Sequence, residues 1–207
     1  MDGPDKPILL VALGGNALIR KGEKGTVTQQ FKNLVLPIRQ IARLSQDYRI
    51  IITHGNGPQV GFILRRSEIA RDQLHEVPLD YCGADTQGAI GYMLQQNLYN
   101  EFQQRSMAKQ ATTIVTQVLV DRDDPGFQNP TKGIGGFTTE EKAREFETEG
   151  WRVVEDAGRG WRRVIASPIP LKIIELDAIR KLVDEGFIVI AVGGGGIPVI
   201  EDENGNL

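Results

Sequence analysis

ILLVALGGN, at residues 8–16, carries the pattern that decides the fold: a continuous apolar run that stops at a pair of glycines. A short apolar run without polar interruptions is typical of a strand buried on both faces, so we expect a central parallel strand at residues 8–13. The same order recurs in RIIITHGNG at residues 49–57 and in FIVIAVGGGG at residues 187–196. The sequence therefore predicts three parallel strands that each end in a glycine loop.

The sequence between these strands has helical periodicity. Apolar residues recur at three- and four-residue steps over residues 26–46, 79–105 and 174–185, and a further helical stretch follows the second glycine loop through Ile69. Residues 111–120 are rich in β-branched side chains, which favours one more strand. Strands that alternate with helices indicate an α/β framework.

The composition changes between residues 121 and 166. An irregular polar segment with several Asp, Pro and Gly residues comes first, followed by a predicted helix at 139–147 and two short strands at 151–155 and 161–165. This pattern is typical of a small subdomain inserted into a larger domain and used as a substrate lid. We expect an α/β domain at residues 1–121 and 166–207, with an inserted α+β lid at residues 122–165.

Charge and composition exclude several classes of function. Lys and Arg number 24 and Asp and Glu 27, so the net charge is −3 and there is no basic excess of the kind that nucleic-acid binding requires. No apolar run approaches the about 20 residues needed to cross a bilayer. One cysteine and two histidines are too few for a structural zinc site, and the single cysteine suits a reducing compartment. We therefore expect a cytoplasmic protein without nucleic-acid or membrane partners and predict no metal-ligating residue.

The glycine loops are the candidate functional feature. Glycine lacks the Cβ that would keep the backbone away from a tetrahedral anion, and successive backbone N–H groups can then face that anion. The carboxyl ends of parallel strands share one edge of the sheet, so the three loops could converge on one phosphoryl group. Each loop alone also fits a simple tight turn. The Walker A pattern is absent, and the dinucleotide pattern fails because the glycine it needs is displaced to Gly61.

Several longer strings carry a family resemblance. They are VALGGNAL (11–18), THGNGPQVG (53–61), GYMLQQ (91–96), TQVLVDRDDPGFQNPTKGIG (116–135), GWRRV (160–164) and AVGGGGIPV (191–199). Together they closely resemble the carbamate kinases of the amino-acid kinase superfamily, along essentially the whole chain.

This resemblance implies an αβα sandwich with a mainly parallel central sheet and a protruding lid. It also implies reversible phosphoryl transfer between ATP and carbamate, a reaction often used in arginine metabolism to form ATP from carbamoyl phosphate and ADP. The expected cofactors are ATP or ADP and Mg²⁺, and the expected partner is a second copy of the chain in a homodimer. The helix that starts at Leu79 is one candidate dimer surface.

The resemblance also assigns roles to residues. Gly14, Gly15 and Asn16, together with Gly55, Asn56 and Gly57, would hold the transferring phosphoryl group and the carbamate. Gly194 and Gly195 would complete the cradle, and Lys132 would be the catalytic lysine of the lid. Carbamate is already an anion and needs no general base, which agrees with a sequence that offers no histidine–carboxylate pair for that role.

The sequence departs from the family at its end. Carbamate kinases continue well beyond the position of Leu207, and we expect the C-terminal nucleotide-binding part to be absent from this chain. The alternatives are a catalytically incomplete anion-binding or dimerising fragment, and another acid kinase of the superfamily, such as an acetylglutamate-type kinase. The NPTK string at residues 129–132 argues against the latter.

Four other sets of side chains are weaker candidates. His54 could contact a ligand or be a buried structural donor. Arg162 and Arg163 are adjacent on a predicted strand, so we expect at most one of them to face a site. Cys82 is interpreted as a small buried side chain, and the Asp123–Asp124 pair is interpreted first as a turn.

Overall fold

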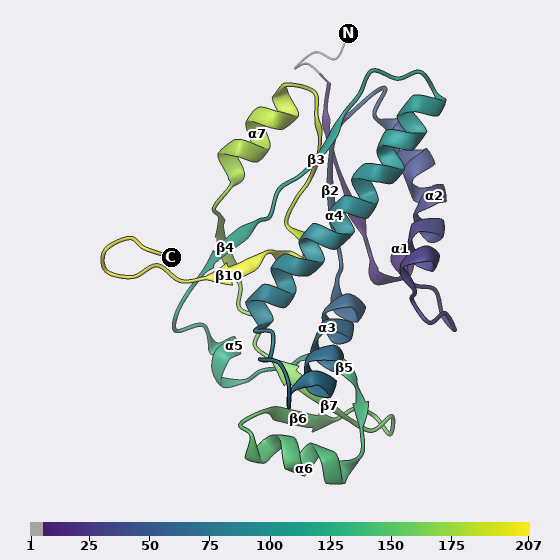
Figure 1. Ribbon diagram of the computed structural model, residues 1–207. Coiled ribbons are helices and arrows are strands. Elements are labelled where there is room, and N and C mark those ends of the chain that lie inside the picture. The colour runs from purple at the N-terminus through teal and green to yellow at the C-terminus, as the bar shows by residue number, and fades with distance from the viewer. Residues whose placement is uncertain (1–5) are drawn as a thin grey trace. The chain divides into compact units, whose positions relative to one another are not determined.

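A computed structural model describes residues 6–207, which form two compact units (Figure 1). The first unit contains the residues up to Asn56, Gly83–Gln117 and Ile173–Ile197. The second contains Gly57–Cys82, Val118–Lys172 and Pro198–Leu207. This grouping differs from the expected division into residues 1–121 with 166–207 and residues 122–165, because residues 57–82 and 198–207 fall in the same unit as the expected lid.

The first unit is built on a parallel sheet. Its strands are β1 (Ile8–Leu13), β2 (Arg49–His54), β9 (Ile188–Ile190) and β3 (Ala111–Thr113), in the order β1-β2-β9-β3. Every neighbouring pair in this sheet is parallel. The three predicted strands that precede glycine loops are therefore adjacent in the sheet.

Helices cover both faces of this sheet (Figure 1). On one face, α2 (Val27–Leu44) and the Gly83–Gln104 part of α4 (Leu79–Gln104) bury residues such as Ile38 and Leu94 against Ile52 and Ile190. On the other face, α7 (Leu176–Asp184) packs Ile179 and Val183 against Val189. Successive residues of β2 and β9 alternate between these two cores, as the pleat of a strand requires. The unit is the αβα sandwich that the resemblance implies.

The prediction that residues 8–13 form a central strand buried on both faces is wrong. Among the described strands, β1 pairs with β2 alone and lies at the edge of the sheet. Ile8 and Leu10 are 52% and 62% exposed, because α7 covers β2 and β9 and does not extend over β1. An uninterrupted apolar run does not distinguish a covered central strand from an edge strand with one uncovered face.

The prediction of one continuous strand at residues 111–120 is also wrong. The segment divides into β3 and β4 (Gln117–Val120), and β4 joins a second sheet with β10 (Ile197–Val199) and β8 (Pro170–Ile173) in the order β10-β4-β8. At the break, the hydroxyl of Thr116 donates to Ile114 O at 2.8 Å. This local hydrogen bond competes with the sheet ladder and turns the chain out of the first sheet.

The second unit combines helices with an antiparallel sheet in the order β5-β7-β6. The strands are β5 (Lys132–Thr138), β6 (Arg152–Glu155) and β7 (Trp161–Ile165), and the main helices are α3 (Gly57–Ala70) and α6 (Glu140–Thr148). The predicted helix and the two predicted strands of the lid are confirmed. The short helix α5 (Pro125–Gln128) and the strand β5 lie where an irregular segment was predicted, because three glycines in residues 132–138 masked the strand pattern.

Helix α3 packs directly on β5. A Cβ added to Gly61 would lie 3.2 Å from the Cα of Gly135, which shows that the two backbones touch. Val60 and Leu64 of α3 form a small core with Ile134 and Cys82. These contacts explain why α3 belongs to the second unit.

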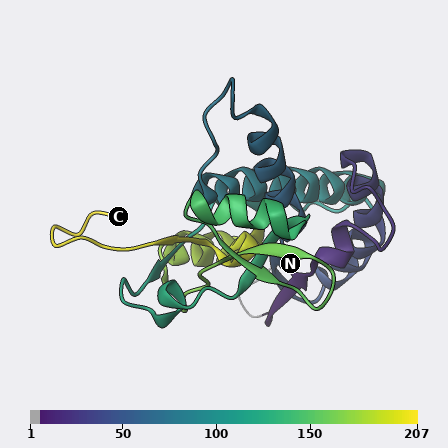
Figure 2. The same cartoon turned by 90° about the horizontal axis from the view of Figure 1, so that it is seen from below.

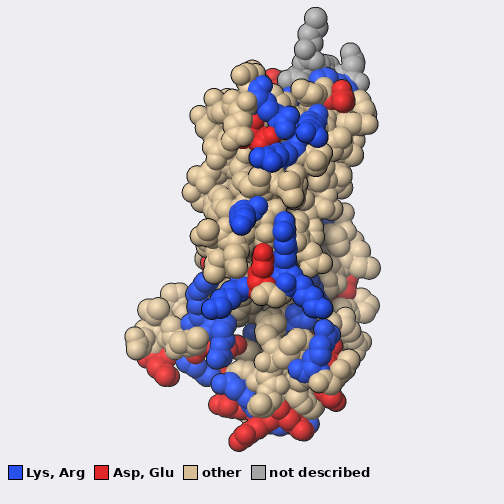
Figure 3. All heavy atoms as spheres, turned by 90° about the vertical axis from the view of Figure 1, so that its right-hand side faces the viewer, with Lys and Arg blue, Asp and Glu red and all other residues tan. Residues whose placement is uncertain are grey.

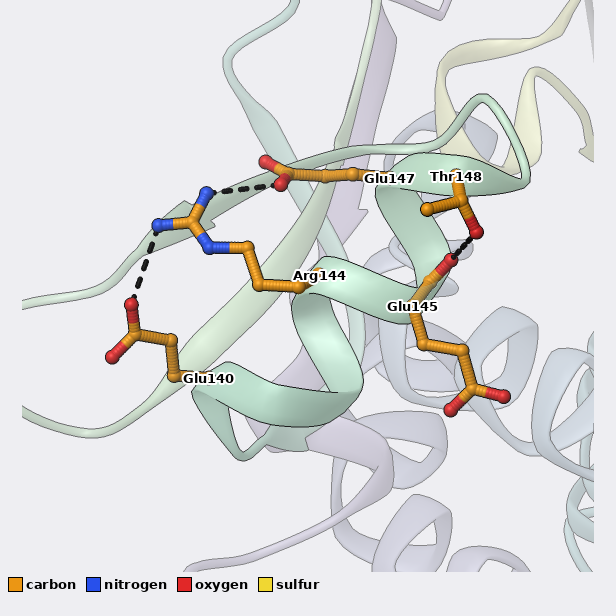
Figure 4. Close-up of polar contacts among 5 residues, drawn as sticks. All are labelled: Glu140, Arg144, Glu145, Glu147 and Thr148. Atoms are coloured by element: carbon orange, nitrogen blue, oxygen red, sulfur yellow. Dashed lines mark hydrogen bonds and ion pairs between the residues drawn. The ribbon is translucent and has the colours of Figure 1, made fainter.

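Helix α6 packs along β6 and β7 (Figure 2) and forms a separate small core from Ala143, Phe146 and Val153. Its exposed face carries a charged cluster in which Arg144 binds Glu147 at 2.9 Å and Glu140 at 3.3 Å (Figure 4). Exposed pairs of this kind contribute little to stability. The helix is therefore held mainly by its apolar face. Among residues 6–207, no helix combines the length and apolar character needed to span a bilayer.

A glycine-to-alanine comparison within α4 tests the packing of this helix on the parallel sheet. A Cβ at Gly91 would overlap Thr113, with Oγ1 at 2.5 Å, whereas a Cβ at Gly88 meets no atom within 4 Å. We expect Gly91→Ala to lower the free energy of unfolding by about 1–3 kcal/mol through overpacking. Gly88→Ala should raise it by up to about 1 kcal/mol through helix propensity.

Urea unfolding measures both values. Adding Thr113→Ala to Gly91→Ala should recover most of the loss, because it removes the overlapping Oγ1 and Cγ2 atoms. Equal stabilities for Gly88→Ala and Gly91→Ala would contradict this packing.

Candidate functional site

The glycine loops that follow β1, β2 and β9 meet at the carboxyl edge of the parallel sheet. Gly14–Asn16 follow β1, Gly55 and Asn56 follow β2, and Gly193–Gly196 follow β9. The first two loops touch, since Gly55 N donates to Leu13 O at 2.9 Å and a Cβ on Gly55 would lie 3.5 Å from Gly15 N. The three loops thus follow neighbouring strands of one sheet in the first unit, and their convergence on one phosphoryl group stays a prediction.

The third loop packs against the second so closely that side chains are excluded. A Cβ on Gly193 would lie 2.5 Å from His54 Nε2, and a Cβ on Gly194 would overlap the side-chain amide of Asn56. Gly194 and Gly195 also have φ values of +68° and +95°, which favour glycine. Both positions therefore require glycine for the backbone, whatever ligand the loop holds.

Val192, at the entry to this loop, has the left-handed φ of +54°, which is unusual for a β-branched residue. Two hydroxyl groups hold it in place. Val192 N donates to Thr116 Oγ1 at 3.0 Å, and the hydroxyl of Thr53 donates to Val192 O at 3.0 Å. The strained residue sets the direction in which the glycines leave β9, as local strain at binding loops often does.

Gln87 of α4 connects the third loop to Thr116, in the segment between β3 and β4 where the chain leaves the parallel sheet. Its side chain is 2% exposed, and its Nε2 donates to Gly193 O at 2.9 Å and to Thr116 O at 3.2 Å. Its Oε1 accepts from Thr116 N at 2.7 Å. Sequence reasoning missed Gln87, although a polar pair, Thr86–Gln87, in a helix segment rich in glycine and alanine was an available signal.

The side chain of Asn56 is engaged by the protein. Its Nδ2 donates to Thr86 Oγ1 at 2.9 Å, and the hydroxyl of Thr86 donates to Gly83 O at 2.9 Å. The amide group of Asn56 therefore positions the second loop on α4. Because the side chain of Asn56 is used in this way, the backbone N–H of Asn56 is the group that could bind a ligand.

Open space lies beside the first loop and part of the third. A Cβ added to Gly14, Gly15 or Gly195 would meet no described atom within 4 Å. Gly15 and Asn16 begin α1 (Gly15–Leu18), so their N–H groups lie in a first helical turn, where the backbone supplies no acceptor. At Gly15 and Asn16 the edge of the sheet thus combines open space with N–H groups that have no acceptor within the helix, which is the arrangement that binds small anions.

His54, at the end of β2, is a buried structural residue. It is 4% exposed, and its Nδ1 donates to Gly55 O across 3.2 Å. Burial lowers the pKa of the His54 imidazole from its ordinary 6.5, and the hydrogen bond to Gly55 acts in the opposite direction. A neutral imidazole that packs on Gly193 supports the loop, as one of the two sequence interpretations stated.

Gly57 and Lys132 lie in the second unit. Gly57 begins α3, and a Cβ there would meet no described atom within 4 Å. Lys132 is exposed at the first position of β5, opposite Ile165 of β7. The two site residues are thus placed on α3 and β5 of this unit, and the remaining predicted site residues are in the first unit.

The structure also places the other side chains that the sequence analysis considered. Cys82 is fully buried, as predicted. The carboxylate of Asp124 accepts from Gly126 N at 2.7 Å and from Ile169 N at 3.0 Å, which supports its interpretation as a turn residue. Arg162 and Arg163 both line one cavity of the second unit. The expectation that at most one of them faces the site at the glycine loops stays a prediction, since this cavity is formed by the second unit alone.

The described residues offer no obvious metal centre. No group of three or more His, Cys, Asp or Glu side chains among residues 6–207 is arranged to hold an ion. The three loops themselves contain no carboxylate. They therefore do not fit a directly bound Mg²⁺ ion, which prefers carboxylate and phosphate oxygens.

A parallel αβα sandwich with glycine loops at the carboxyl edge of its sheet belongs to the α/β class, in which ligands commonly bind at that edge. The sequence profile of the Amino acid kinase family matches residues 7–206, and the chain therefore belongs to this family.

Individual relatives narrow the comparison. The carbamate kinase of Thermococcus kodakarensis is 52% identical over 205 residues, which cover 96% of this chain and 64% of that protein. The carbamate kinase of Pyrococcus horikoshii is 51% identical over 204 residues, with the same coverage. The solved structure of carbamate kinase from Giardia lamblia bound to AMP-PNP is 41% identical, with a TM-score of 0.88 over 97% of this chain and 64% of that chain. The chain thus spans just under two thirds of the length of these relatives.

The burial of His54 predicts a pH dependence of stability. In the unfolded chain the His54 imidazole has its ordinary pKa of 6.5, and in the native state its pKa is lower. Below pH 6.5 the unfolded state therefore binds more protons than the native state. The stability contribution of neutral His54 is present above pH 6.5 and is lost as the pH falls through the native pKa.

We expect His54→Gln to flatten the fall in unfolding free energy between about pH 7 and about pH 5. Urea unfolding across this range measures the slope. His75→Gln is the matched control because His75 is exposed, and it should keep the wild-type slope. An unchanged slope in the His54 variant would contradict the buried neutral state.

Proposed function

We propose that the chain carries the carbamate- and phosphoryl-binding part of a carbamate kinase, which transfers a phosphoryl group reversibly between ATP and carbamate. The observation that carries this proposal is the meeting of three glycine loops at one edge of the parallel sheet, with open space beside Gly14, Gly15 and Gly195. Relatives that match almost the whole chain are carbamate kinases, which supports the choice of substrate.

The proposed chemistry consists of positioning and charge stabilisation. Backbone N–H groups of Gly14–Asn16, Asn56 and Gly194 would bind phosphoryl and carbamate oxygens. Gly55 and Gly195 belong to the same proposed cradle, but their N–H groups donate to Leu13 O and Val192 O, so they would shape the loops around the ligand. Gly57 and Lys132 are assigned to the same task from the second unit. Carbamate attacks as an anion, so no side chain needs to remove a proton, and the buried neutral imidazole of His54 does not serve as a base. Fixed N–H dipoles and one lysine charge would stabilise the transferring group.

ATP or ADP is the proposed second substrate, because the reaction requires a phosphoryl donor or acceptor. Mg²⁺ is proposed as a companion of the nucleotide phosphates, and no residue of this chain is assigned to it. The expected lid, residues 122–165, is proposed to cover the bound substrate. A cytoplasmic location belongs to the same proposal.

A second candidate function is an anion-binding module without kinase activity. It is favoured by one specific observation: the three glycine loops lie together in the first unit, whereas no group of three or more His, Cys, Asp or Glu side chains among residues 6–207 is arranged to hold an ion. The two functions separate in one experiment that measures carbamoyl phosphate binding and ATP formation from ADP and carbamoyl phosphate. Both signals support the kinase, binding alone supports the module, and the absence of both contradicts the proposed site.

Gly15→Ala tests the cradle. Its Cβ would enter the open space where a phosphoryl oxygen is proposed to lie, and the helical backbone of Gly15 tolerates alanine. We expect carbamoyl phosphate to bind at least about tenfold more weakly, with the free energy of unfolding changed by less than about 0.5 kcal/mol. Calorimetric titration measures binding. Gly88→Ala on the exposed face of α4 is the matched control and should bind like the wild type, and wild-type affinity in Gly15→Ala would exclude the cradle.

Lys132→Ala tests the lysine. In a protein that carries this sequence and forms ATP, we expect turnover to fall about 100-fold or more through loss of charge stabilisation. Stability should change little, because Lys132 is exposed. Lys172→Ala, at another exposed strand position, is the control and should retain activity. Wild-type turnover in Lys132→Ala would remove this lysine from the mechanism.

We also propose that the protein is a homodimer that uses the exposed face of α4. Tyr92 and Tyr99 are 59% and 62% exposed, and their seven-residue spacing places them on one helix face. They border a shallow cavity of about 840 Å³ that also reaches Phe102 and Met107. We expect Tyr99→Arg to convert a dimer into a monomer in sedimentation at micromolar concentration. A monomeric wild type would contradict the proposal.

A further inference from the structure

The second unit contains a cavity of about 680 Å³, and Gly57 is the one residue of its wall that the proposed function uses. Residues of α3, β5, α6 and β7 line it, and all of them belong to this one unit. Lys and Arg side chains gather around a hollow in the lower half of the face shown in Figure 3. The cavity is large enough for a small organic ligand.

The charges that line the cavity are unbalanced. Four cationic side chains border it, from Arg65, Lys142, Arg162 and Arg163, and Glu68 is the one acidic side chain on its wall. Glu68 is already engaged, because its carboxylate binds Arg65 at 2.8 Å. The remaining cationic side chains therefore face the cavity without a carboxylate on its wall to neutralise them.

Arg163 is the most informative of these side chains. It is half-buried, its guanidinium lies 3.9 Å from the centre of the Trp151 ring, and it makes no ion pair within residues 6–207. Burial lowers the pKa of Arg163, and the more distant carboxylates of Glu76 and Glu68 act in the opposite direction. A guanidinium has five N–H donors, and burying it without an anionic partner is costly.

The neighbouring Arg162 also lies near an aromatic ring, at a greater distance. Its Nε makes one long hydrogen bond, 3.4 Å, to Ile134 O, and its guanidinium lies 5.6 Å from the centre of the Phe137 ring. Adjacent arginines that stack on aromatic rings keep their in-plane N–H groups available for an acceptor. The guanidinium groups of Arg162 and Arg163 at one cavity can therefore donate hydrogen bonds to two negatively charged oxygens of one ligand.

Four aromatic side chains also line the cavity. Phe62, Phe137, Phe146 and Trp151 line the cavity, and Phe146 stacks on Trp151 with ring centres 4.5 Å apart. An inorganic anion would leave these apolar surfaces in contact with water. A ligand that also carries a ring would cover them.

We propose that this cavity binds a small organic dianion with an aromatic body, of the aryl phosphate class, through Arg162 and Arg163. The dianion accepts hydrogen bonds from the two guanidinium groups, and its ring packs on the aromatic wall. The inference goes beyond carbamate kinase activity, because it rests on Arg162, Arg163 and the aromatic side chains of the wall, none of which has an assigned role in phosphoryl transfer.

Tryptophan fluorescence of the full chain tests the proposal directly. The chain has two tryptophans, Trp151 on the cavity wall and Trp161, so a Trp161→Phe variant leaves one reporter at the site. In that background we expect phenyl phosphate to give a saturable change with a stoichiometry of one. Phenol lacks the dianion and inorganic phosphate lacks the ring, so each should bind at least about tenfold more weakly.

Arg163→Gln should weaken the binding of phenyl phosphate at least about tenfold. Arg152→Gln is the matched control, because Arg152 is exposed on β6, binds Gln128 O and does not line the cavity. Lys142→Gln provides a second cavity variant at an exposed position that folding does not depend on, and it should also weaken binding. Three results would each overturn the proposal: no saturable change, equal affinity for phenol, or wild-type affinity in both Lys142→Gln and a folded Arg163→Gln.

Discussion

The side-chain amide of Gln87 is the interaction on which the geometry of the candidate site depends. It binds the backbone of Thr116 through both its donor and its acceptor, and it also binds Gly193 O. Replacing it by an apolar residue would leave buried backbone groups without partners, which costs about 1–3 kcal/mol for each group. One side chain on α4 thus fixes both the start of the third glycine loop and the point where the chain leaves the parallel sheet.

The contacts around this amide explain why the loops are so rich in glycine. Gly193 packs on the ring of His54, and Gly194 packs on the amide of Asn56, which is itself held by Thr86. These glycines serve the close approach of the second and third loops. Gly195 is required by its φ of +95°, although it also faces open space, whereas Gly14 and Gly15 face open space without a left-handed φ. The division separates glycines that the backbone requires from glycines that leave room for a ligand.

Much of this arrangement could be predicted from sequence, because apolar runs that end in glycines have few structural interpretations. The parallel strands and the shared edge of the loops follow from that pattern. The exposure of Ile8 and Leu10 could not be predicted, since it depends on how far α7 extends over the sheet. The break at Thr116 and the role of Gln87 were missed because they arise from one side chain that meets a segment 29 residues away. The strand β5 was missed because its three glycines hide the alternation of side chains.

The central claim is that the loops at the carboxyl edge of β1, β2 and β9 bind the phosphoryl group through backbone N–H groups. The most direct measurement is a titration of the ¹⁵N-labelled chain with carbamoyl phosphate, followed by the amide chemical shifts. The proposal predicts that the largest shifts fall on Gly14–Asn16, Gly55, Asn56, Gly194 and Gly195. Largest shifts on amides outside the three loops, or saturating ligand without any shift in them, would contradict it.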